Sequence, residues 1–212
     1  MKPAIKICGV RDIETYKLLL ALKVEWLGLV FYPKSPRYVT SDQIKLFPKN
    51  AEYTKRVGLF VKPKIEDIET VLNQIPLDIL QIYDSLENVT SLRNYFKLPT
   101  WAAIGVHTKA DLPMQCSLEG LVVEAPTFEG DAQPGGNGRS FNWSLTTQWK
   151  APVPWLLAGG LNSANVVDAL RCSRAKAVDV SSGVESSRGV KDRNKIKHFV
   201  NAVRQYDIAS AF

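Results

Sequence analysis

The chain has 212 residues, of which 45% are hydrophobic and 23% charged, and its net charge at pH 7 is +6. This length supports a core that needs no disulfide or metal, and the composition is that of a soluble globular protein. No segment approaches the ~20 apolar residues of a membrane span, and the N-terminus lacks a signal peptide. We therefore expect a cytoplasmic protein. Its basic residues are scattered, which argues against a nucleic-acid partner and suits a small anionic substrate.

The cysteines and histidines give no metal or disulfide pattern. Cys8, Cys116 and Cys172 are odd in number, widely spaced and without a CxxC pair, so we expect free thiols. His107 and His198 have no ligand spacing to each other or to a cysteine. The sequence therefore predicts no metal site.

Apolar β-rich runs alternate with segments of helical periodicity along the chain. The eight predicted strands are 4–9, 26–31, 56–61, 78–83, 101–106, 120–125, 155–160 and 176–183. The predicted helices are 11–23, 64–75, 86–96, a short one at 109–116, 162–171 and 192–206. A long glycine-rich loop follows the sixth strand.

This alternation predicts an α/β fold with a parallel sheet covered on both faces. Eight strands favour a single (β/α)8 TIM barrel over residues 1–212, near the lower size limit of that fold. A doubly wound sheet of about five or six strands is the alternative, but it would leave two of the runs without a place.

In such a barrel the reacting groups lie at the C-terminal ends of the strands and in the loops after them. The alternation of side chains along a strand selects the residues that face inward near those ends. They are Lys6, Cys8, Gln81, Tyr83, Glu124, Asp179 and Ser181.

Cys8 and Glu124 are the most informative of these residues. Cys8 ends its strand on the same face as Lys6, and the lysine could lower the pKa of the thiol. The alternative is an inert buried cysteine. Glu124 closes an apolar strand, where a carboxylate needs a partner or a function. A salt bridge between Glu124 and Lys6 is the alternative there.

Two glycine-bearing turns follow the seventh and eighth strands, at Gly159–Gly160 and Ser182–Gly183. Backbone N–H groups in such turns can hold a phosphate, and phosphate-binding barrels place their site after these strands. The alternative is that the glycines only permit tight turns. Arg37, after the second strand, could bind a carboxylate or phosphate through two N–H groups, or it could be a solvated surface charge.

Several sequence blocks occur in order along nearly the whole chain: KICGVRD, GLVFYPKSPRYV, RVGLFV, GGNGRSFNW, WLLAGGLN and DVSSGVE followed by GVKD. Through these blocks the chain resembles the phosphoribosylanthranilate isomerase family. The resemblance implies a (β/α)8 barrel that is monomeric or homodimeric and uses no cofactor. It also implies an Amadori rearrangement of N-(5-phosphoribosyl)anthranilate to 1-(2-carboxyphenylamino)-1-deoxyribulose 5-phosphate in tryptophan biosynthesis.

The resemblance further implies roles for individual residues. Cys8 would be the general base, and Glu124 would be the general acid at a position where the family has aspartate. Arg37 would hold the anthranilate carboxylate, Asp179 would contact the ribose or amino region, and Tyr83 would also bind substrate. The phosphate would rest on backbone N–H groups near Gly159, Gly160, Ser182 and Gly183.

The chain departs from the family pattern at three places. Glu124 is longer than aspartate by one C–C bond, roughly 1.5 Å, and a misplacement of ~1 Å can cost on the order of 100-fold in rate. Glu129 and Asp131, in the following loop, are alternative acids. Tyr83 stands where the family has histidine. Asn142 replaces an aspartate and keeps a side chain that can cap a helix.

Two alternative functions remain open from the sequence. Another aminoaldose phosphate isomerase of this fold would use paired aspartates at the ends of strands one and five, where this chain has Cys8 and Val106 or His107. A phosphate-binding protein that has lost the activity is the second, and its support is the departures at Glu124 and Tyr83.

Overall fold

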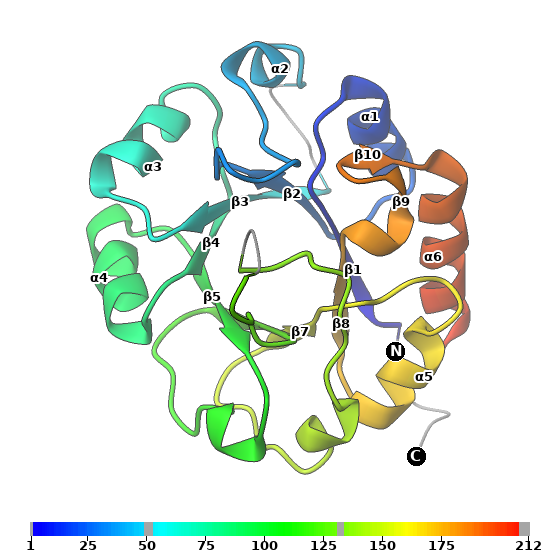
Figure 1. Cartoon of the computed structure of the whole chain (residues 1–212). Coiled ribbons are helices and arrows are strands. Elements are labelled where there is room, and N and C mark those ends of the chain that lie inside the picture. The colour runs from blue at the N-terminus through cyan, green and yellow to red at the C-terminus, as the bar shows by residue number, and fades with distance from the viewer. Residues whose placement is uncertain (1, 49–52, 131–133, 208–212) are drawn as a thin grey trace.

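The computed structural model describes residues 2–48, 53–130 and 134–207. Eight parallel strands pair in chain order and close into a barrel, which confirms the fold predicted from the sequence (Figure 1). The barrel strands are β1 (Ala4–Cys8), β2 (Trp26–Val30), β3 (Lys55–Val61), β4 (Ile79–Tyr83), β5 (Thr100–Gly105), β6 (Gly120–Glu124), β7 (Trp155–Leu157) and β8 (Ala177–Val180). That residues 1–212 form one domain stays a prediction.

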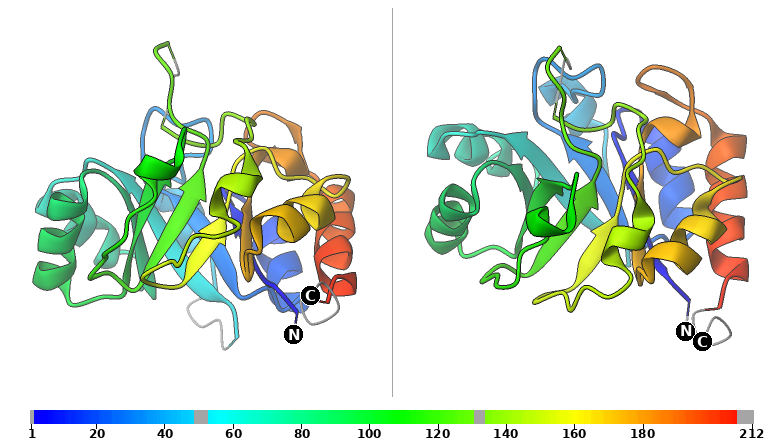
Figure 2. Two further views of the ribbon diagram at one scale, coloured as in Figure 1. Left: turned by 90° about the horizontal axis from the view of Figure 1, so that it is seen from below. Right: turned by 60° about the horizontal axis from the view of Figure 1, so that its bottom comes forward.

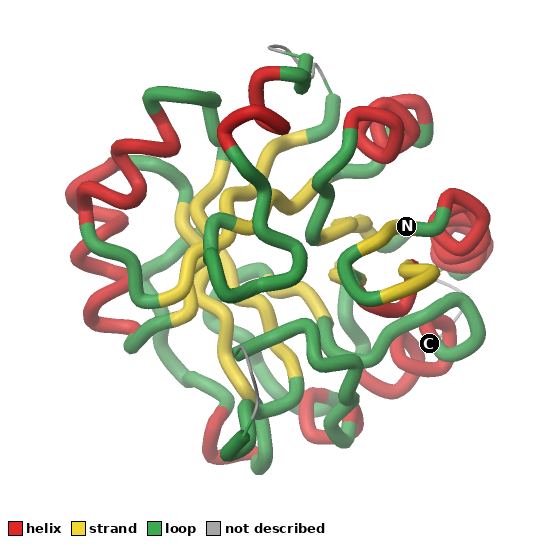
Figure 3. Tube along the Cα trace, turned by 45° about the horizontal axis from the view of Figure 1, so that its top comes forward, coloured by secondary structure: helices red, strands yellow, loops and turns green. Residues whose placement is uncertain are grey.

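Helices surround the strands on the outside of the barrel (Figure 3). The α-helices are α1 (Ile13–Ala21), α2 (Ser41–Lys45), α3 (Ile65–Leu72), α4 (Leu86–Phe96), α5 (Val166–Ser173) and α6 (Arg193–Gln205). Short 3-10 turns lie in the loops after β5, β6 and β8, and they are η1 (Lys109–Asp111), η2 (Trp143–Thr146) and η3 (Ser182–Val184). In the described part of the chain, no helix is long and apolar enough to cross a membrane.

The helix predicted at 109–116 is wrong in length. It is reduced to η1, which ends at Asp111, two residues before Pro113. A proline cannot donate the hydrogen bond that would continue the helix, and its ring disfavours a helical conformation of the residue before it.

Alternate residues of the strands face either the barrel interior or the helices. On β1, Ile5 and Ile7 join the main hydrophobic core, whereas Cys8 joins a small inner cluster that Tyr83 of β4 contacts. The predicted inward direction of Cys8 and Tyr83 is therefore correct. A second inner cluster fills the barrel interior with Val57, Ile79, Trp101, Ala103, Val122, Leu156, Ala158 and Ala177.

A buried ion pair joins the first and last strands of the barrel. β1 and β8 are neighbours, and their register places Lys6 opposite Asp179. Lys6 is fully buried, and its Nζ lies 3.0 Å from Oδ2 of Asp179. The salt bridge considered for Lys6 and Glu124 is thus formed by Lys6 and Asp179 instead.

A hairpin that the sequence did not predict follows η3. It consists of β9 (Glu185–Ser187) and β10 (Val190–Lys191), which pair antiparallel. The hairpin lies beside the barrel, next to α1 and α6 (Figure 1). The loop after β6 rises at the end of the barrel toward which the strands point (Figure 2).

Replacing Lys6 with methionine should destabilise the protein by roughly 3–5 kcal/mol, because the Asp179 carboxylate would stay buried without its counter-ion. Urea denaturation followed by tryptophan fluorescence measures the change. A Lys6→Met/Asp179→Asn variant should recover part of the loss, since both charges are then removed. Equal stability of wild type and Lys6→Met would contradict a charged pair.

Candidate active site

A pocket opens at the C-terminal ends of the strands. Most of the residues selected from the sequence line this pocket, and they are Cys8, Arg37, Tyr83, Glu124, Gly159, Gly160, Asp179, Ser181 and Ser182. Gly183 is not part of the lining. A β-carbon on Gly183 would lie 1.8 Å from the carbonyl oxygen of Leu161, so this glycine packs against the loop after β7.

Cys8 ends β1 at the floor of the pocket and is buried. Burial raises the pKa of its thiol; Lys6 and Lys191 act to lower the pKa, and Asp179 acts to raise it. The predicted influence of Lys6 is therefore present, but burial outweighs it. The cysteine is a thiol at neutral pH, and it becomes a base only after it loses its proton.

Glu124 ends β6, three strands round the barrel from β1, and its side chain is also buried. Burial raises the pKa of its carboxyl to about 8, although a hydrogen bond with Tyr83 acts to lower it. The carboxyl is thus protonated at neutral pH and can donate a proton. Burial also raises the pKa of Tyr83 well above its ordinary value, so the tyrosine keeps its hydroxyl proton.

The loop after β6 covers the Tyr83 and Glu124 side chains. A β-carbon on Gly135 would lie 2.4 Å from the Tyr83 hydroxyl and 2.7 Å from Oε1 of Glu124. The neighbouring Gly136 contributes a backbone hydrogen bond to the Glu124 carboxyl. A larger residue at position 135 would therefore have to displace the Tyr83 hydroxyl and the Glu124 carboxyl.

The other candidate groups lie away from the pocket or outside the described residues. Glu129 is exposed and does not line the pocket, and Asp131 lies outside the described residues. His107 and His198 are exposed. Asn142 caps η2 as predicted, with its Oδ1 accepting a hydrogen bond 3.1 Å long from the backbone N–H of Ser144.

Arg37 is buried rather than solvated, so the surface-charge alternative is wrong. Its Nε and Nη2 donate hydrogen bonds of 2.7 and 3.0 Å to the Glu185 carboxylate. A β-carbon on Gly9 would lie 2.6 Å from Cδ of Arg37, and the φ of Gly9 is +77°. A glycine at position 9 therefore gives the arginine side chain its path.

Asp179 lines the pocket, and its two carboxyl oxygens differ in their partners. Its Oδ2 binds Lys6, whereas its Oδ1 is buried and has no hydrogen-bond partner among the described residues. Buried acceptors without a partner are uncommon in folded proteins. The pairing with Lys6 thus leaves the second oxygen of this carboxyl unused by the described residues.

The glycine turn after β7 packs tightly against the loop after β6. Gly159 and Gly160 have φ values of +87° and +64°, and β-carbons on them would each lie 2.8 Å from the backbone of the loop after β6. Tight packing therefore requires these glycines. Within the described part of the chain, the backbone N–H groups of Gly160 and Ser182 donate no hydrogen bond to a loop or turn carbonyl. An anion in the pocket could therefore accept from them.

Sequence reasoning assigned no role to Glu185 and Lys191. The side chains of both are buried, and Nζ of Lys191 lies 2.8 Å from Oε1 of Glu185. The signal was present in the block DVSSGVE followed by GVKD, which places two charged residues near a glycine turn. No group of three or more His, Cys, Asp or Glu side chains in the described ranges is arranged to hold a metal ion.

Comparison with known proteins shows the family to which the chain belongs. A family model of N-(5'-phosphoribosyl)anthranilate isomerase matches residues 5–202. The chain belongs to the phosphoribosylanthranilate isomerase family. The isomerase of Acidiphilium cryptum is 46% identical over 198 residues, which cover 93% of this chain and 96% of the relative. That of Paramagnetospirillum magneticum is 42% identical over 212 residues, covering 96% and 98%.

Solved structures of phosphoribosylanthranilate isomerases share the fold. The enzyme from Thermotoga maritima has a TM-score of 0.82 and 29% identity, covering 96% of this chain and all of the other. A crystal structure in complex with reduced 1-(o-carboxyphenylamino)-1-deoxyribulose 5-phosphate has a TM-score of 0.79 and 27% identity, with 96% of this chain covered. The predictions of a TIM barrel and of an isomerase of tryptophan biosynthesis are thus confirmed.

Tyr83→Phe should raise the pKa of Glu124 above about 8, because the hydrogen bond with Tyr83 acts to lower that pKa. A ¹³C NMR titration of glutamate side-chain carboxyls measures the change, and Glu124→Gln identifies the resonance. Tyr95→Phe is the matched control, since Tyr95 bonds to exposed Glu69 and should leave the Glu124 pKa unchanged. An unchanged or lower pKa in Tyr83→Phe would contradict the interaction.

Proposed function

We propose that this chain catalyses the Amadori rearrangement of N-(5'-phosphoribosyl)anthranilate, with Glu124 as general acid and Cys8 as general base. The observation that carries this proposal is the presence of a protonated carboxyl and a thiol in one pocket at the strand ends. An acid and a base with different environments can serve two proton transfers on one substrate. Membership of the family supports the same reaction.

The proposed reaction needs one proton donated to the ribose ring oxygen and one proton removed from C2 of the same sugar. Glu124 gives its proton to the ribose ring oxygen while the C1–O bond breaks, and the nitrogen lone pair forms an iminium at C1. The Cys8 thiolate then removes the proton from C2, which gives an enolamine. The enolamine becomes the ketone when its hydroxyl loses a proton and C1 gains one, so no atom is gained or lost.

The other groups of the pocket would bind the substrate. The ligand named for the related crystal structure is a carboxyphenylamino sugar phosphate, so it has a carboxylate and a phosphate. In this chain, Arg37 would hold the carboxylate, and Asp179 would contact the ribose or amino region. The phosphate would rest on backbone N–H groups near Gly160 and Ser182, with Gly159 and Gly183 shaping the two turns. A cytoplasmic location and a monomeric or homodimeric state stay predictions.

Loss of the substrate's anthranilate fluorescence, followed with the purified protein, tests the reaction. Cys8→Ser and Glu124→Gln should each lower kcat at least about 100-fold with little change in KM, because each removes a proton-transfer group. Cys172→Ser, at an exposed thiol, is the matched control and should keep full activity. Full activity of Glu124→Gln would move the acid to Glu129 or Asp131, and an inactive wild type would refute the proposal.

The pH dependence of kcat/KM should reflect a protonated Glu124 and an ionised Cys8. The pKa of Glu124 is about 8 and burial raises that of Cys8, so the enzyme fraction with both correct states rises with pH and levels off above about pH 8. A rise of about tenfold per pH unit is expected below that point. Initial rates at subsaturating substrate between pH 6.5 and about 9 measure the profile. A decline between pH 7 and 8 would contradict these protonation states.

A further inference from the structure

One edge of the Arg37 guanidinium is fully occupied by Glu185. Nε of Arg37 lies 2.7 Å from Oε1 of Glu185, and Nη2 lies 3.0 Å from Oε2. This is a bidentate pair, which fixes the plane of the guanidinium as well as its distance. The side chains of both residues are 4% exposed, so water competes little with the pair.

The second edge of the same guanidinium remains available. Arginine has five N–H donors, and Glu185 takes those on the side of Nε. The donors of Nη1 and the second donor of Nη2 have no acceptor among the described residues, whereas Arg37 itself lines the pocket. This end-on fork has the geometry that binds a second carboxylate.

Lys191 supplies a second cation to the same carboxylate. Its Nζ donates to Oε1 of Glu185 at 2.8 Å and to the backbone oxygen and hydroxyl of Ser181 at 2.9 and 3.2 Å. The Lys191 side chain is 1% exposed. Two cations therefore share one anion, and the buried group keeps one excess positive charge beside the pocket.

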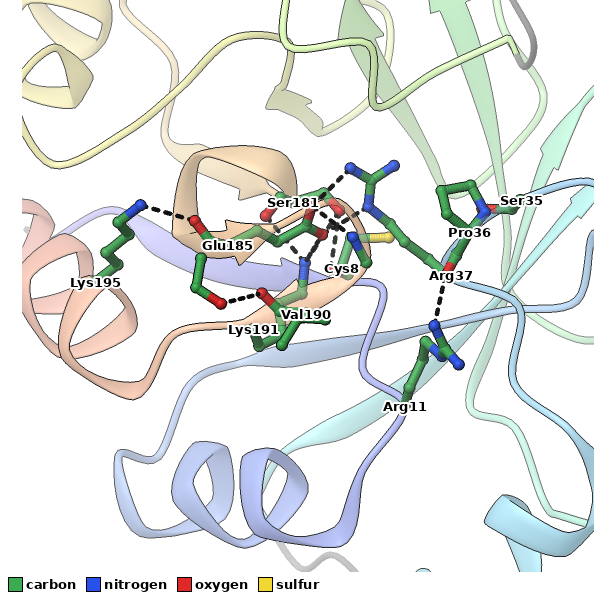
Figure 4. Close-up of polar contacts among 12 residues, drawn as sticks. Cys8, Arg11, Ser35, Pro36, Arg37, Ser181, Glu185, Val190, Lys191 and Lys195 are labelled. Atoms are coloured by element: carbon green, nitrogen blue, oxygen red, sulfur yellow. Dashed lines mark hydrogen bonds and ion pairs between the residues drawn. The ribbon is translucent and has the colours of Figure 1, made fainter.

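The hairpin of β9 and β10 holds this group against the loop after β2 (Figure 4). The N–H of Gly189 donates to Oε2 of Glu185 at 3.0 Å. A β-carbon on Gly189 would lie 2.5 Å from the carbonyl oxygen of Pro36, which also accepts a 2.6 Å hydrogen bond from Arg11. Pro36, next to Arg37, is thus held between Gly189 of the hairpin and the side chain of Arg11.

We propose that Glu185 and Lys191 are positioning residues that aim Arg37 at the carboxylate of the substrate. Glu185 orients the guanidinium by binding Nε and Nη2 of Arg37. Lys191 balances the negative charge of Glu185, so that the positive charge of Arg37 still attracts the substrate carboxylate. This inference rests on the proposed function, in which Arg37 holds that carboxylate.

Binding of two ligands tests the inference by calorimetry. The first is reduced 1-(2-carboxyphenylamino)-1-deoxyribulose 5-phosphate, and the second is the same compound without its carboxylate. The ratio of their dissociation constants reports the carboxylate contact alone, because both ligands share every other group. Arg37→Met should abolish the preference for the first ligand. Glu185→Gln should reduce the preference at least about tenfold, the usual size of one charge-assisted hydrogen bond.

A double variant and a control separate positioning from general disruption. Arg37→Met/Glu185→Gln should lose no more of the preference than Arg37→Met alone, since both residues act on one contact. Lys195→Met is the matched control and should keep the wild-type ratio. Among the described residues, the Lys195 side chain bonds only to the backbone oxygen of Glu185, at 2.7 Å, and not to its carboxylate. If Glu185→Gln fails to fold, Lys191→Met decides, with an expected reduction of at least about threefold from loss of one charge.

Two results would overturn the inference, and they have different meanings. If Arg37→Met loses the preference while folded Glu185→Gln and Lys191→Met keep it, the positioning role is wrong and the proposed function stands. If Arg37→Met keeps the wild-type preference, the carboxylate contact assumed in the proposed function is wrong, and the inference falls with it.

Discussion

Closure of the barrel removes the charged groups of the site from water, and their chemistry follows from this constraint. Lys6 is fully buried, and Glu124 and Asp179 are 6% and 8% exposed. A buried charge is costly unless it has a counter-ion, and a group without one tends to lose its charge. Lys6 and Asp179 form a pair, whereas Glu124 has no cation bonded to it among the described residues and has a pKa of about 8. The position of Glu124 at the buried end of β6 thus keeps its carboxyl protonated at neutral pH.

Burial raises the pKa of both the acid and the base of the proposed reaction, but the consequences differ. It keeps both Glu124 and Cys8 protonated, which prepares Glu124 to donate and leaves Cys8 without its reactive charge. Lys6 and Lys191 offset part of this cost, because both stabilise a thiolate. Lys191 therefore has two effects. It forms an ion pair with the Glu185 carboxylate beside Arg37, and its charge lowers the pKa of the Cys8 thiol.

The sequence predicted what depends on local periodicity. The alternation of strands and helices, the closed barrel and the inward direction of Cys8 and Tyr83 all follow from repeats within a few residues. Side-chain partners did not follow, because they depend on how distant strands align. Lys6 meets Asp179 across 173 residues, and Arg37 meets Glu185 across 148. The hairpin of β9 and β10 was missed because its strands are three and two residues long, too short for a periodic signal.

The glutamate at position 124 is best understood together with its surroundings. A glutamate has one more rotatable bond than an aspartate and loses more conformational freedom when it is fixed in place. Tyr83 and the backbone of Gly136 both bond to its carboxyl, and Gly135 leaves the space that the longer side chain enters. These contacts restrict the carboxyl to one position, which a proposed acid requires. The two residues that the sequence resemblance marked as departures, Tyr83 and Glu124, therefore form one local arrangement, in which the tyrosine hydroxyl bonds to the glutamate carboxyl.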